Sequence, residues 1–405
     1  MPRDIIPIVP VERPASGTSS VGQSGLRAMP PLTLYVHVPW CVRKCPYCDF
    51  NSHEQPNVLP ERDYLDALLA DLDQALPLIW GRQVHAIFIG GGTPSLLSAK
   101  AVDEMMSSIR ARLAIWPDAE VTLEANPGTA EASRFQSYAA SGINRLSLGV
   151  QSFGDVQLKA LGRIHDSAQA RRAIELAQAA VKRVNIDMMY GLPAQSPAQF
   201  ERDLTTAISF GTEHLSLYQL TLEPQTVFAK YPPTLPGETD LEAMESMIDQ
   251  IALGQGWQRY EVSAYAKPGA QCRHNLNYWR FGDYLGIGPG AHSKISSPER
   301  ILRQARTRNP SQWMQSARRS DGSHISETRE LSSSDLVFEF FLNGLRLVEG
   351  VGVNLFESHT GLPLSQARVA LDRAVAKGLL TQSDGQIKAT DLGWRHLNDL
   401  QANFL

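Results

Sequence analysis

Cysteine is scarce in this chain, and its scarcity excludes one class of protein. Only four cysteines occur in 405 residues, too few for the disulfide framework of a small secreted domain. Such usage fits a reducing compartment, so we expect a cytoplasmic protein. Cys41, Cys45 and Cys48 lie close together in the sequence, whereas Cys272 stands apart.

An excess of charge of either sign is lacking as well. The 38 Lys and Arg residues nearly balance the 42 Asp and Glu residues, for a net charge of −4, so the basic surface of a nucleic-acid binder is not expected. No apolar run approaches the roughly 18 residues that a membrane-spanning helix needs. The first residues show neither a long apolar segment nor an Arg-rich amphipathic pattern, so we expect no secretory or transit signal.

Short apolar runs alternate with amphipathic segments from Leu34 onward. Each run is followed by a loop with polar residues and then by a helix of period 3.6, such as the leucine stripe over 65–76. Strands that alternate with such helices form right-handed βαβ units in a parallel sheet. The expected α/β fold has six such strands, at 34–38, 85–89, 121–124, 145–150, 184–189 and 214–220.

The cysteine trio follows the first strand as Cys41-Val-Arg-Lys-Cys45-Pro-Tyr-Cys48. Three thiols cannot close a four-coordinate structural site. Iron–sulfur clusters use thiolate ligands, and a trio leaves the fourth iron of a four-iron cluster open for a small molecule. The alternative is a zinc ion that borrows one nearby side chain, His37, His53 or Asp49.

Polar residues follow the strands at the ends where ligands sit in parallel α/β sheets. The loop Gly90-Gly-Gly-Thr-Pro94 follows the second strand; its missing Cβ atoms let the backbone approach a ligand, unless it is a plain turn. Glu124, Gln151 and Asp187 end the next three strands and should face one mouth, the alternative for the acids being a helix cap or loop ion pair. Arg163 is either a partner for a ligand carboxylate or a surface arginine.

The spacing C-x3-C-x2-C, with the lead-in Tyr35-x-His37-x-Pro39, resembles the radical S-adenosylmethionine (SAM) superfamily. That resemblance implies an open, partial barrel of six βα units, a 4Fe–4S cluster and a SAM molecule chelated to its open iron. The strand-end residues are similar to those of the coproporphyrinogen III dehydrogenase-like group. This similarity implies ligand contacts from Tyr35, Tyr47, Gly91, Gly92, Thr93, Glu124, Gln151, Arg163 and Asp187.

Two stretches separate the chain from the dehydrogenase itself. The dehydrogenase pattern has another cysteine two residues after the third ligand, where this chain has Phe50, and Cys-Asp-Phe-Asn resembles the HemW branch, whose members are viewed as haem chaperones. The stretch His274-Asn-Leu-Asn-Tyr-Trp279 matches the haem-binding motif of that branch. Imidazole can ligate haem iron and aromatic rings can cover a porphyrin, so the resemblance implies haem contacts from His274, Asn275, Tyr278 and Trp279.

Three residues of this region keep plain alternatives. His274 is otherwise a buried, hydrogen-bonded histidine. Cys272 is expected as a small core residue, with thiolate ligation of haem iron as the alternative. His292 follows Gly288-Pro-Gly290-Ala, where the family comes near the nucleoside, and is otherwise a turn histidine.

The βα rhythm stops at about residue 305. Helices at 336–347 and 365–377, a hairpin at 378–390 and a last helix at 391–404 resemble a winged-helix module, and the weakly charged hairpin favours packing or partner docking over DNA binding. The expected division is a flexible N-terminal arm over 1–30, a radical SAM partial barrel with a haem-motif extension over 31–304, and a C-terminal HemN/HemW-type domain over 305–405.

The resulting hypothesis is a haem chaperone with a 4Fe–4S cluster on the three clustered cysteines and an exchangeable SAM. It would pass haem to an acceptor protein, for which a respiratory protein is one candidate, and it would need a reductant for the cluster. The enzyme alternative is oxidative decarboxylation of coproporphyrinogen III, in which a reduced cluster cleaves SAM to a 5′-deoxyadenosyl radical that abstracts hydrogen. A zinc-bearing regulator with a winged helix is the third class.

Overall fold

The computed structural model describes residue 26 and residues 28–129 and 132–405. Of the expected flexible arm over 1–30, residues 1–25 and 27 lie outside the described residues. Leu26 and Pro30 are buried against the body of the protein, so this last part of the arm is packed.

One twelve-stranded sheet forms the body of the protein, and its centre holds the six parallel strands that the sequence predicts. They are adjacent in chain order, as successive βα units require. Their register brings Leu34 beside Ile87 and Ile87 beside Val121. The strands are β1 (Leu32–Val38), β4 (Val84–Gly91), β5 (Ile115–Ala125), β6 (Arg145–Gln151), β7 (Arg183–Tyr190) and β8 (His214–Gln219).

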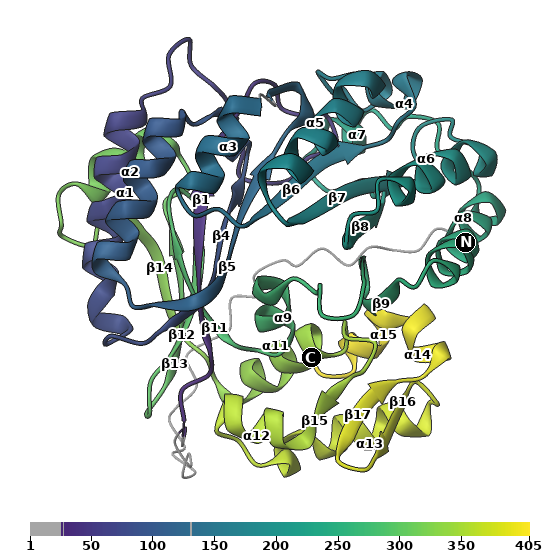
Figure 1. Ribbon diagram of the computed structural model, residues 1–405. Helices are drawn as coiled ribbons and strands as arrows, with labels where there is room; N and C mark the ends of the chain where they lie inside the picture. Colours follow the sequence, from purple (N-terminus) through teal and green to yellow (C-terminus); the bar gives the residue numbers. More distant parts are fainter. Residues whose placement is uncertain (1–25, 27, 130–131) are drawn as a thin grey trace.

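Amphipathic helices cover the outside of the curved sheet, and its inner face turns toward α9 (Arg273–Trp279) (Figure 1). Their apolar faces and the sheet form the larger hydrophobic core. The expected stripe is confirmed in α1, where Leu65, Leu68 and Leu72 are buried. The covering helices are α1 (Glu61–Ala75), α2 (Ala99–Arg112), α3 (Ala132–Ala140), α5 (Ser167–Ala180), α6 (Pro197–Ser209) and α8 (Glu238–Gly254), with the shorter α4 (Asp155–Ala160) and α7 (Val227–Lys230) between them.

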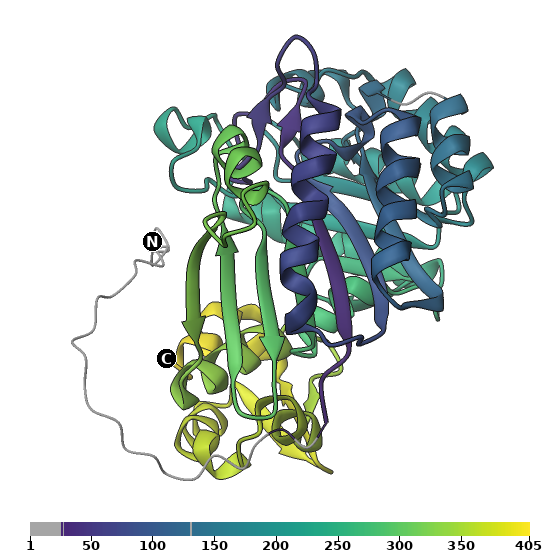
Figure 2. The same cartoon turned by 90° about the vertical axis from the view of Figure 1, so that its left-hand side faces the viewer.

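The sheet continues on both sides of the six strands, which the sequence pattern does not indicate. Figure 2 shows the long green strands beyond β1, where the second strand of this extension runs antiparallel to the first. The extensions are β11 (Asp283–Ile287), β12 (His292–Ser296), β13 (Ile301–Arg306) and β14 (Ile325–Glu330) on one side, with α10 (Pro310–Ala317), and β10 (Ala264–Ala266) and β9 (Gln258–Glu261) on the other.

The C-terminal domain has its own hydrophobic core. A three-stranded sheet packs with helices in it, as a winged-helix module would have, and the expected last helix is split in two at His396. The expected boundary at 304/305 falls inside β13, so we place the boundary near residue 331. The elements are α11 (Ser333–Gly344), β15 (Val351–Gly352), α12 (Val353–Thr360), α13 (Arg368–Ala376), β16 (Leu380–Ser383), β17 (Gln386–Ala389), α14 (Asp391–Arg395) and α15 (Leu397–Ala402).

Candidate functional site

The three clustered cysteines lie in one loop directly after β1. The short strands β2 (Trp40–Cys41) and β3 (His53–Glu54) pair in parallel and close the base of this loop. Within it, the Cys48 N–H donates to the Cys45 carbonyl at 3.2 Å. All three thiols are free and half-buried. The loop therefore holds three thiols at the edge of solvent, at the carboxyl end of the first strand.

The arrangement of these thiols differs from that of a closed mononuclear site. Among the described residues, no three Cys, His, Asp or Glu side chains converge as ligands of one metal ion would. The ring of His37 accepts or donates at both nitrogens, to the Tyr35 hydroxyl and the Asn51 carbonyl, both at 2.9 Å, so it is not free to complete a zinc site. The ligands of a four-iron cluster bind different irons, so they do not have to converge on one point.

Polar neighbours surround the thiols. Burial raises the pKa of Cys41 and of Cys48, while hydrogen bonds with Thr93 and Ser52 oppose the rise. Arg163 donates from Nη1 to the Cys45 sulfur at 3.6 Å. A positive charge and hydroxyl donors favour thiolate, which is the form that binds iron.

The glycine loop after β4 packs against the chain that leads into the cysteine loop. Gly92 donates to the Val38 carbonyl and Thr93 to the Trp40 carbonyl, both at 2.7 Å. Gly91 has φ +111°, and a Cβ there would lie 2.5 Å from the His37 ring. Glycine is thus required by the local fold, so a Gly91→Val change would disturb this loop rather than only block a ligand.

Two acidic residues expected to face one mouth, Glu124 and Asp187, lie on β5 and β7 with β6 between them, and they interact electrostatically. Glu124 accepts from the Gly91 N–H at 3.0 Å, and Asp187 accepts from Ser147 at 3.0 Å and from Asn185 at 2.8 Å. Desolvation, followed by the charge of Asp187, raises the pKa of Glu124 to about 8. Desolvation also raises the pKa of Asp187. Neither group makes an ion pair within the described part of the chain, unlike the loop ion pair that was the alternative.

Gln151 and Arg163 complete this edge of the sheet. Gln151 has φ +70°, and its Oε1 is buried without a hydrogen-bond partner among the described residues. Arg163 is half-buried, donates to the Gly149 carbonyl at 2.6 Å, and leaves its buried Nε without a partner within the same residues. Arg163 therefore lies beside the cysteine loop and is not a surface arginine. Unsatisfied buried polar atoms are costly, and here they gather beside the cysteine loop.

A cavity of about 440 Å³ opens between these strand ends and the β11–β13 extension, within the size range of small-molecule sites. Its walls include half-buried Tyr35, Gly91 and Glu124, whereas Phe50, with 62 % of its surface exposed, and His292 stand at its rim. The remaining lining residues are His37, Asn51, Tyr278, Tyr284, Gly290 and Arg308. The cavity thus joins residues expected to contact SAM with one from the expected haem motif.

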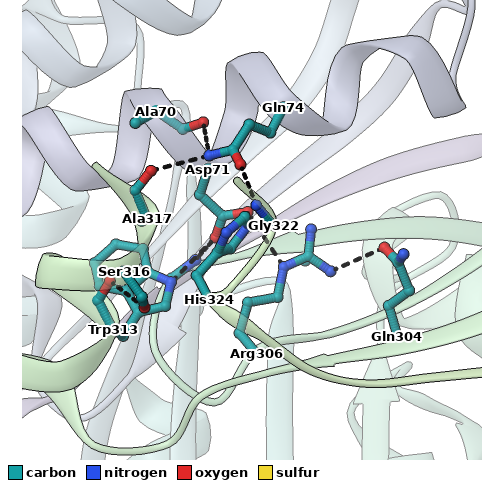
Figure 3. A network of polar contacts seen from close by, with 12 residues as sticks. Ala70, Asp71, Gln74, Gln304, Arg306, Trp313, Ser316, Ala317, Gly322 and His324 are labelled. Atoms are coloured by element: carbon teal, nitrogen blue, oxygen red, sulfur yellow. Dashed lines mark hydrogen bonds and ion pairs between the residues drawn. The ribbon is translucent and has the colours of Figure 1, made fainter. Parts of the chain in front are cut away.

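The wall opposite the glycine loop is fixed by a buried ion network around Asp71 of α1. Figure 3 shows Asp71 among Arg306, Trp313 and His324, whose nitrogens donate to its carboxylate at 3.2, 3.3 and 3.1 Å. The same carboxylate accepts from the Gly288 N–H at 3.1 Å. Burial of Asp71 is outweighed by Arg306 and these donors, and its pKa is lowered. The turn that precedes His292 is therefore anchored to α1.

Asn51 joins this wall to the cysteine loop. Its amide donates to the Pro289 and Arg308 carbonyls, both at 2.9 Å, while its own carbonyl interacts with His37. Asn51, Tyr284 and Arg308 also line the cavity and were not predicted from the sequence. Asn51 stands in the Cys-Asp-Phe-Asn stretch and was within reach of that reasoning. Tyr284 and Arg308 belong to the β11–β14 extension, which the sequence pattern does not indicate.

Helix α9, which carries the expected haem motif, lies between the barrel and the C-terminal domain (Figure 1). His274 is 3 % exposed, stacks on Phe88 with ring centres 5.0 Å apart, and meets Tyr278 edge-on at 4.9 Å. Burial, with a smaller effect of Arg145, lowers its pKa to about 3, and its Nδ1 has no hydrogen-bond partner in the described structure. His274 is buried, as its plain alternative stated, but its ring makes no hydrogen bond that the described residues show.

The motif residues do not share one face. Tyr278 lines the cavity and packs on Tyr284 at 4.2 Å. Trp279 instead packs against the C-terminal core, with the Arg346 guanidinium 4.3 Å from its ring. Asn275, like Trp279, is not among the lining residues of the cavity that the described residues form.

Cys272 is a core residue. It is fully buried, its sulfur lies 3.4 Å from Glu120 Oε1, and burial raises its pKa to about 12. A fully buried thiol beside a carboxylate is poorly reactive, so the plain expectation for Cys272 suits the structure.

A parallel α/β sheet with a three-cysteine loop after its first strand and a glycine loop after the next defines the radical SAM class. Residues 35–207 match the radical SAM superfamily, and residues 331–396 match the HemN C-terminal domain. The structure is similar to that of coproporphyrinogen III oxidase (HemN) from Escherichia coli, with a TM-score of 0.79 and 23 % identity, covering 93 % of this chain and 90 % of the other. At this identity the likeness concerns the fold alone.

Sequence relatives define the family more narrowly. The chain is 48 % identical over 379 residues to the heme chaperone HemW of Escherichia coli, covering 93 % of this chain and 99 % of the relative. It is 45 % identical to the heme chaperone HemW of Haemophilus influenzae, with coverage of 93 % and 98 %. It is 38 % identical to the mouse mitochondrial radical S-adenosyl methionine domain-containing protein 1, with coverage of 78 % and 74 %. The chain belongs to the HemW family.

A helix must be long and apolar to span a bilayer. None of the helices in the described part of the chain is long and apolar enough to cross a membrane.

Proposed function

We propose that this protein is a haem chaperone that binds haem and passes it to an acceptor protein. One observation carries the proposal: a single cavity joins Tyr278 of α9 to the polar strand ends beside the cysteine loop. Phe50 at the rim supports it, because this side chain stands where the decarboxylating enzyme has a cysteine and offers apolar contact to a porphyrin. The name of the close relatives, heme chaperone, points the same way.

Cys41, Cys45 and Cys48 would hold a 4Fe–4S cluster. The residues fit this group because three free thiols share one loop, with Arg163 and two hydroxyls beside them. When bound, the cluster and SAM supply one-electron chemistry, and the proposal includes a reductant for the cluster. The chain's own part is to hold the three thiols in one loop, to leave one side of the loop open and to position SAM.

SAM would bind beside this loop as an exchangeable ligand. Gly91, which Gly92 follows, lines the cavity, and Gln151 and Arg163 have buried polar atoms without partners among the described residues. Glu124 and Asp187 make no ion pair with a described residue, and SAM carries a positively charged sulfonium group that could interact with them. Thr93, Tyr35 and Tyr47 surround these groups; Tyr47 packs on Phe228 at 6.3 Å.

Haem would lie against the aromatic part of the cavity, where Tyr278 and Tyr284 pack together. The buried His274 supports this wall from behind. We also propose a cytosolic location, because the cysteines are few and free. The acceptor is a haem protein.

A paired assay of the whole chain tests this function. The cluster is reconstituted anaerobically, SAM is added, and ferric haem is titrated while the Soret band is followed. We expect about one haem per chain, with an affinity in the micromolar to nanomolar range, roughly −8 to −12 kcal/mol. The same preparation, given coproporphyrinogen III and a reductant, should form no protoporphyrinogen IX. Robust decarboxylation without stoichiometric haem binding would replace the chaperone with the oxidase.

A further inference from the structure

A chain of hydrogen bonds runs from Asp187, on the side of the cavity where SAM would bind, to the start of helix α9. The Asp187 carboxylate accepts from the Asn185 amide nitrogen at 2.8 Å. The Asn185 amide oxygen lies 2.6 Å from Nδ1 of His214, whose Nε2 lies 2.8 Å from the Tyr260 hydroxyl. This hydroxyl accepts from the N–H of Cys272, the N-cap residue of α9, at 3.3 Å. The four residues that follow Asp187 in this chain are buried.

The direction of each hydrogen bond follows from the chemistry of its partners. An ionised Asp187 carboxylate can only accept, so Asn185 presents its nitrogen to Asp187 and its oxygen to His214. His214 must then carry a proton on Nδ1. Burial lowers the pKa of His214 well below the ordinary value, so the ring is neutral and its Nε2 accepts from the Tyr260 hydroxyl.

Helix α9 at the other end of the chain cannot meet haem fully in its present position. Its Tyr278 lines the cavity, but the ring of His274 is 3 % exposed, because it is stacked on Phe88 of β4 and covered by Tyr278. Contact between haem and this ring, which the family resemblance implies, therefore requires α9 to shift away from β4. Such a shift breaks the bond between Tyr260 and the N–H of Cys272.

A cation beside Asp187 strengthens the hold of this chain on α9. Desolvation raises the pKa of Asp187, and the sulfonium group of SAM opposes that effect by favouring the ionised carboxylate. The ionised carboxylate polarises the Asn185 amide, the His214 ring and the Tyr260 hydroxyl in turn. Buried hydrogen bonds in such a chain strengthen one another, so the bond to the start of α9 is strengthened as well.

We infer that SAM and haem oppose each other's binding through His214 and Tyr260, which act as positioning residues between Asp187 and helix α9. This inference rests on the proposed haem-binding function and on the proposed SAM site. Coupling between two ligands is reciprocal, so haem must weaken SAM binding by the same factor as SAM weakens haem binding. Arrival of SAM thus favours release of haem to the acceptor, and departure of SAM favours the loading of haem.

The test measures the affinity for each ligand with and without the other, in the full-length protein whose cluster has been reconstituted anaerobically. Haem binding is followed by the Soret band and SAM binding by calorimetry. We expect saturating SAM to weaken haem binding by about fivefold or more, which is the usual range for coupled sites. Saturating haem should weaken SAM binding by the same factor.

Two variants interrupt the chain at neighbouring points. Tyr260→Phe keeps the aromatic ring and removes the hydroxyl between His214 and α9. His214→Asn keeps a donor toward Asn185, but its shorter side chain does not reach Tyr260. We expect both variants to bind each ligand, with affinities for SAM and haem that no longer depend on each other.

Tyr265→Phe is the matched control. Tyr265 is also buried, and its hydroxyl donates to Asp249 at 3.0 Å, outside the chain. This variant should keep the coupling of the unmodified protein. A merely structural role of the Tyr260 hydroxyl would lower the stability of Tyr260→Phe and leave the coupling unchanged.

The outcomes separate the inference from the function on which it rests. Coupling of full size in folded Tyr260→Phe or His214→Asn protein would overturn the inference. A haem affinity that SAM leaves unchanged or increases in the unmodified protein would also overturn it, and in either case the chaperone function stands. If the unmodified protein binds no haem, the proposed function itself fails, and if it binds haem but no SAM, the proposed SAM site fails.

Discussion

Asp71 and Glu124 differ in the number and charge of the groups that surround their carboxyl groups. Asp71 is fully buried and receives hydrogen bonds from Arg306, Trp313, His324 and a backbone N–H, so its pKa is lowered. Glu124, at the cavity, receives one backbone N–H and faces another acid, so its pKa rises to about 8.

This difference distinguishes a structural part of the protein from a part that is suited to bind a ligand. A buried carboxylate matched by a guanidinium and several donors is structural, since every charge has its partner. A carboxyl group that makes no ion pair with a described residue, beside buried polar atoms that lack partners there, is suited to bind a cationic ligand. The Asp71 network anchors the wall of the cavity, and the Glu124 side of the same cavity is left for binding.

The largest expected effect concerns the cysteine loop, which belongs to the ligand-binding part of the protein. Replacing Cys45 by Ala should abolish the four-iron cluster, because two thiolates cannot hold it with an open iron. Iron and sulfide analysis and the visible absorption spectrum of the anaerobically reconstituted protein measure this.

Cys272→Ala is the matched control, since Cys272 is buried in the core, bonded to Glu120. It should retain the cluster. If the Cys45→Ala protein kept its full iron content, the assignment of the cysteine loop as the cluster site would be wrong.

The second-largest expected effect concerns the Asp71 network, which is structural. Asp71→Ala leaves Arg306, 1 % exposed, as an unpaired buried charge, so the free energy of unfolding should fall by about 3–5 kcal/mol. Denaturant unfolding of the protein without haem or SAM gives the value. Because the pKa of Asp71 is lowered in the folded state, its contribution should be present above pH 3.8, the ordinary value, and be lost as pH falls through the folded-state pKa.

Asp66→Ala on the same helix is the control, because this aspartate is exposed and pairs at the surface with Arg62. Its change should stay within about 1 kcal/mol. Equal losses in the two variants would mean that the Asp71 network does not stabilise the wall.

The smallest effect concerns Glu124. The sulfonium of SAM favours the ionised carboxyl, whose pKa is about 8 in the free protein. SAM affinity should therefore rise as pH increases toward 8 and level off above it, with one proton released on binding below that pH. Glu124→Gln should weaken SAM binding by roughly tenfold, about 1.4 kcal/mol, and should abolish the pH slope. Calorimetry in buffers of different ionisation enthalpy measures both.

Glu120→Gln is a less suitable comparison because Glu120 pairs with Arg183 at 2.6 Å. Glu104→Gln, on the surface of α2, is the control and should keep both affinity and slope. A pH-independent wild-type affinity would show that the Glu124 carboxyl does not respond to the ligand.

Much of this architecture is predictable from local pattern. The six parallel strands and the helix stripes follow from periodicity, since a strand buried under helices must be apolar and a covering helix must repeat at 3.6 residues. The cysteine loop, the glycine loop and the strand-end positions of Glu124, Gln151 and Asp187 follow because parallel strands bring their carboxyl ends to one edge. The strands β11–β14 lie outside this pattern, because they pair antiparallel with one another and a helix, α10, occurs in just one of their connections.

The sequence by itself determined which chemistry the chain carries: three thiols in one loop, bare glycines and acids at strand ends, and an aromatic motif with a histidine. Only the tertiary structure decided which of these groups meet. It buried His274 and turned Trp279 toward the C-terminal core, since neighbouring positions of a helix face different directions. It placed His292 and Arg308 at the rim through strand pairing over a long sequence separation, which no local pattern encodes.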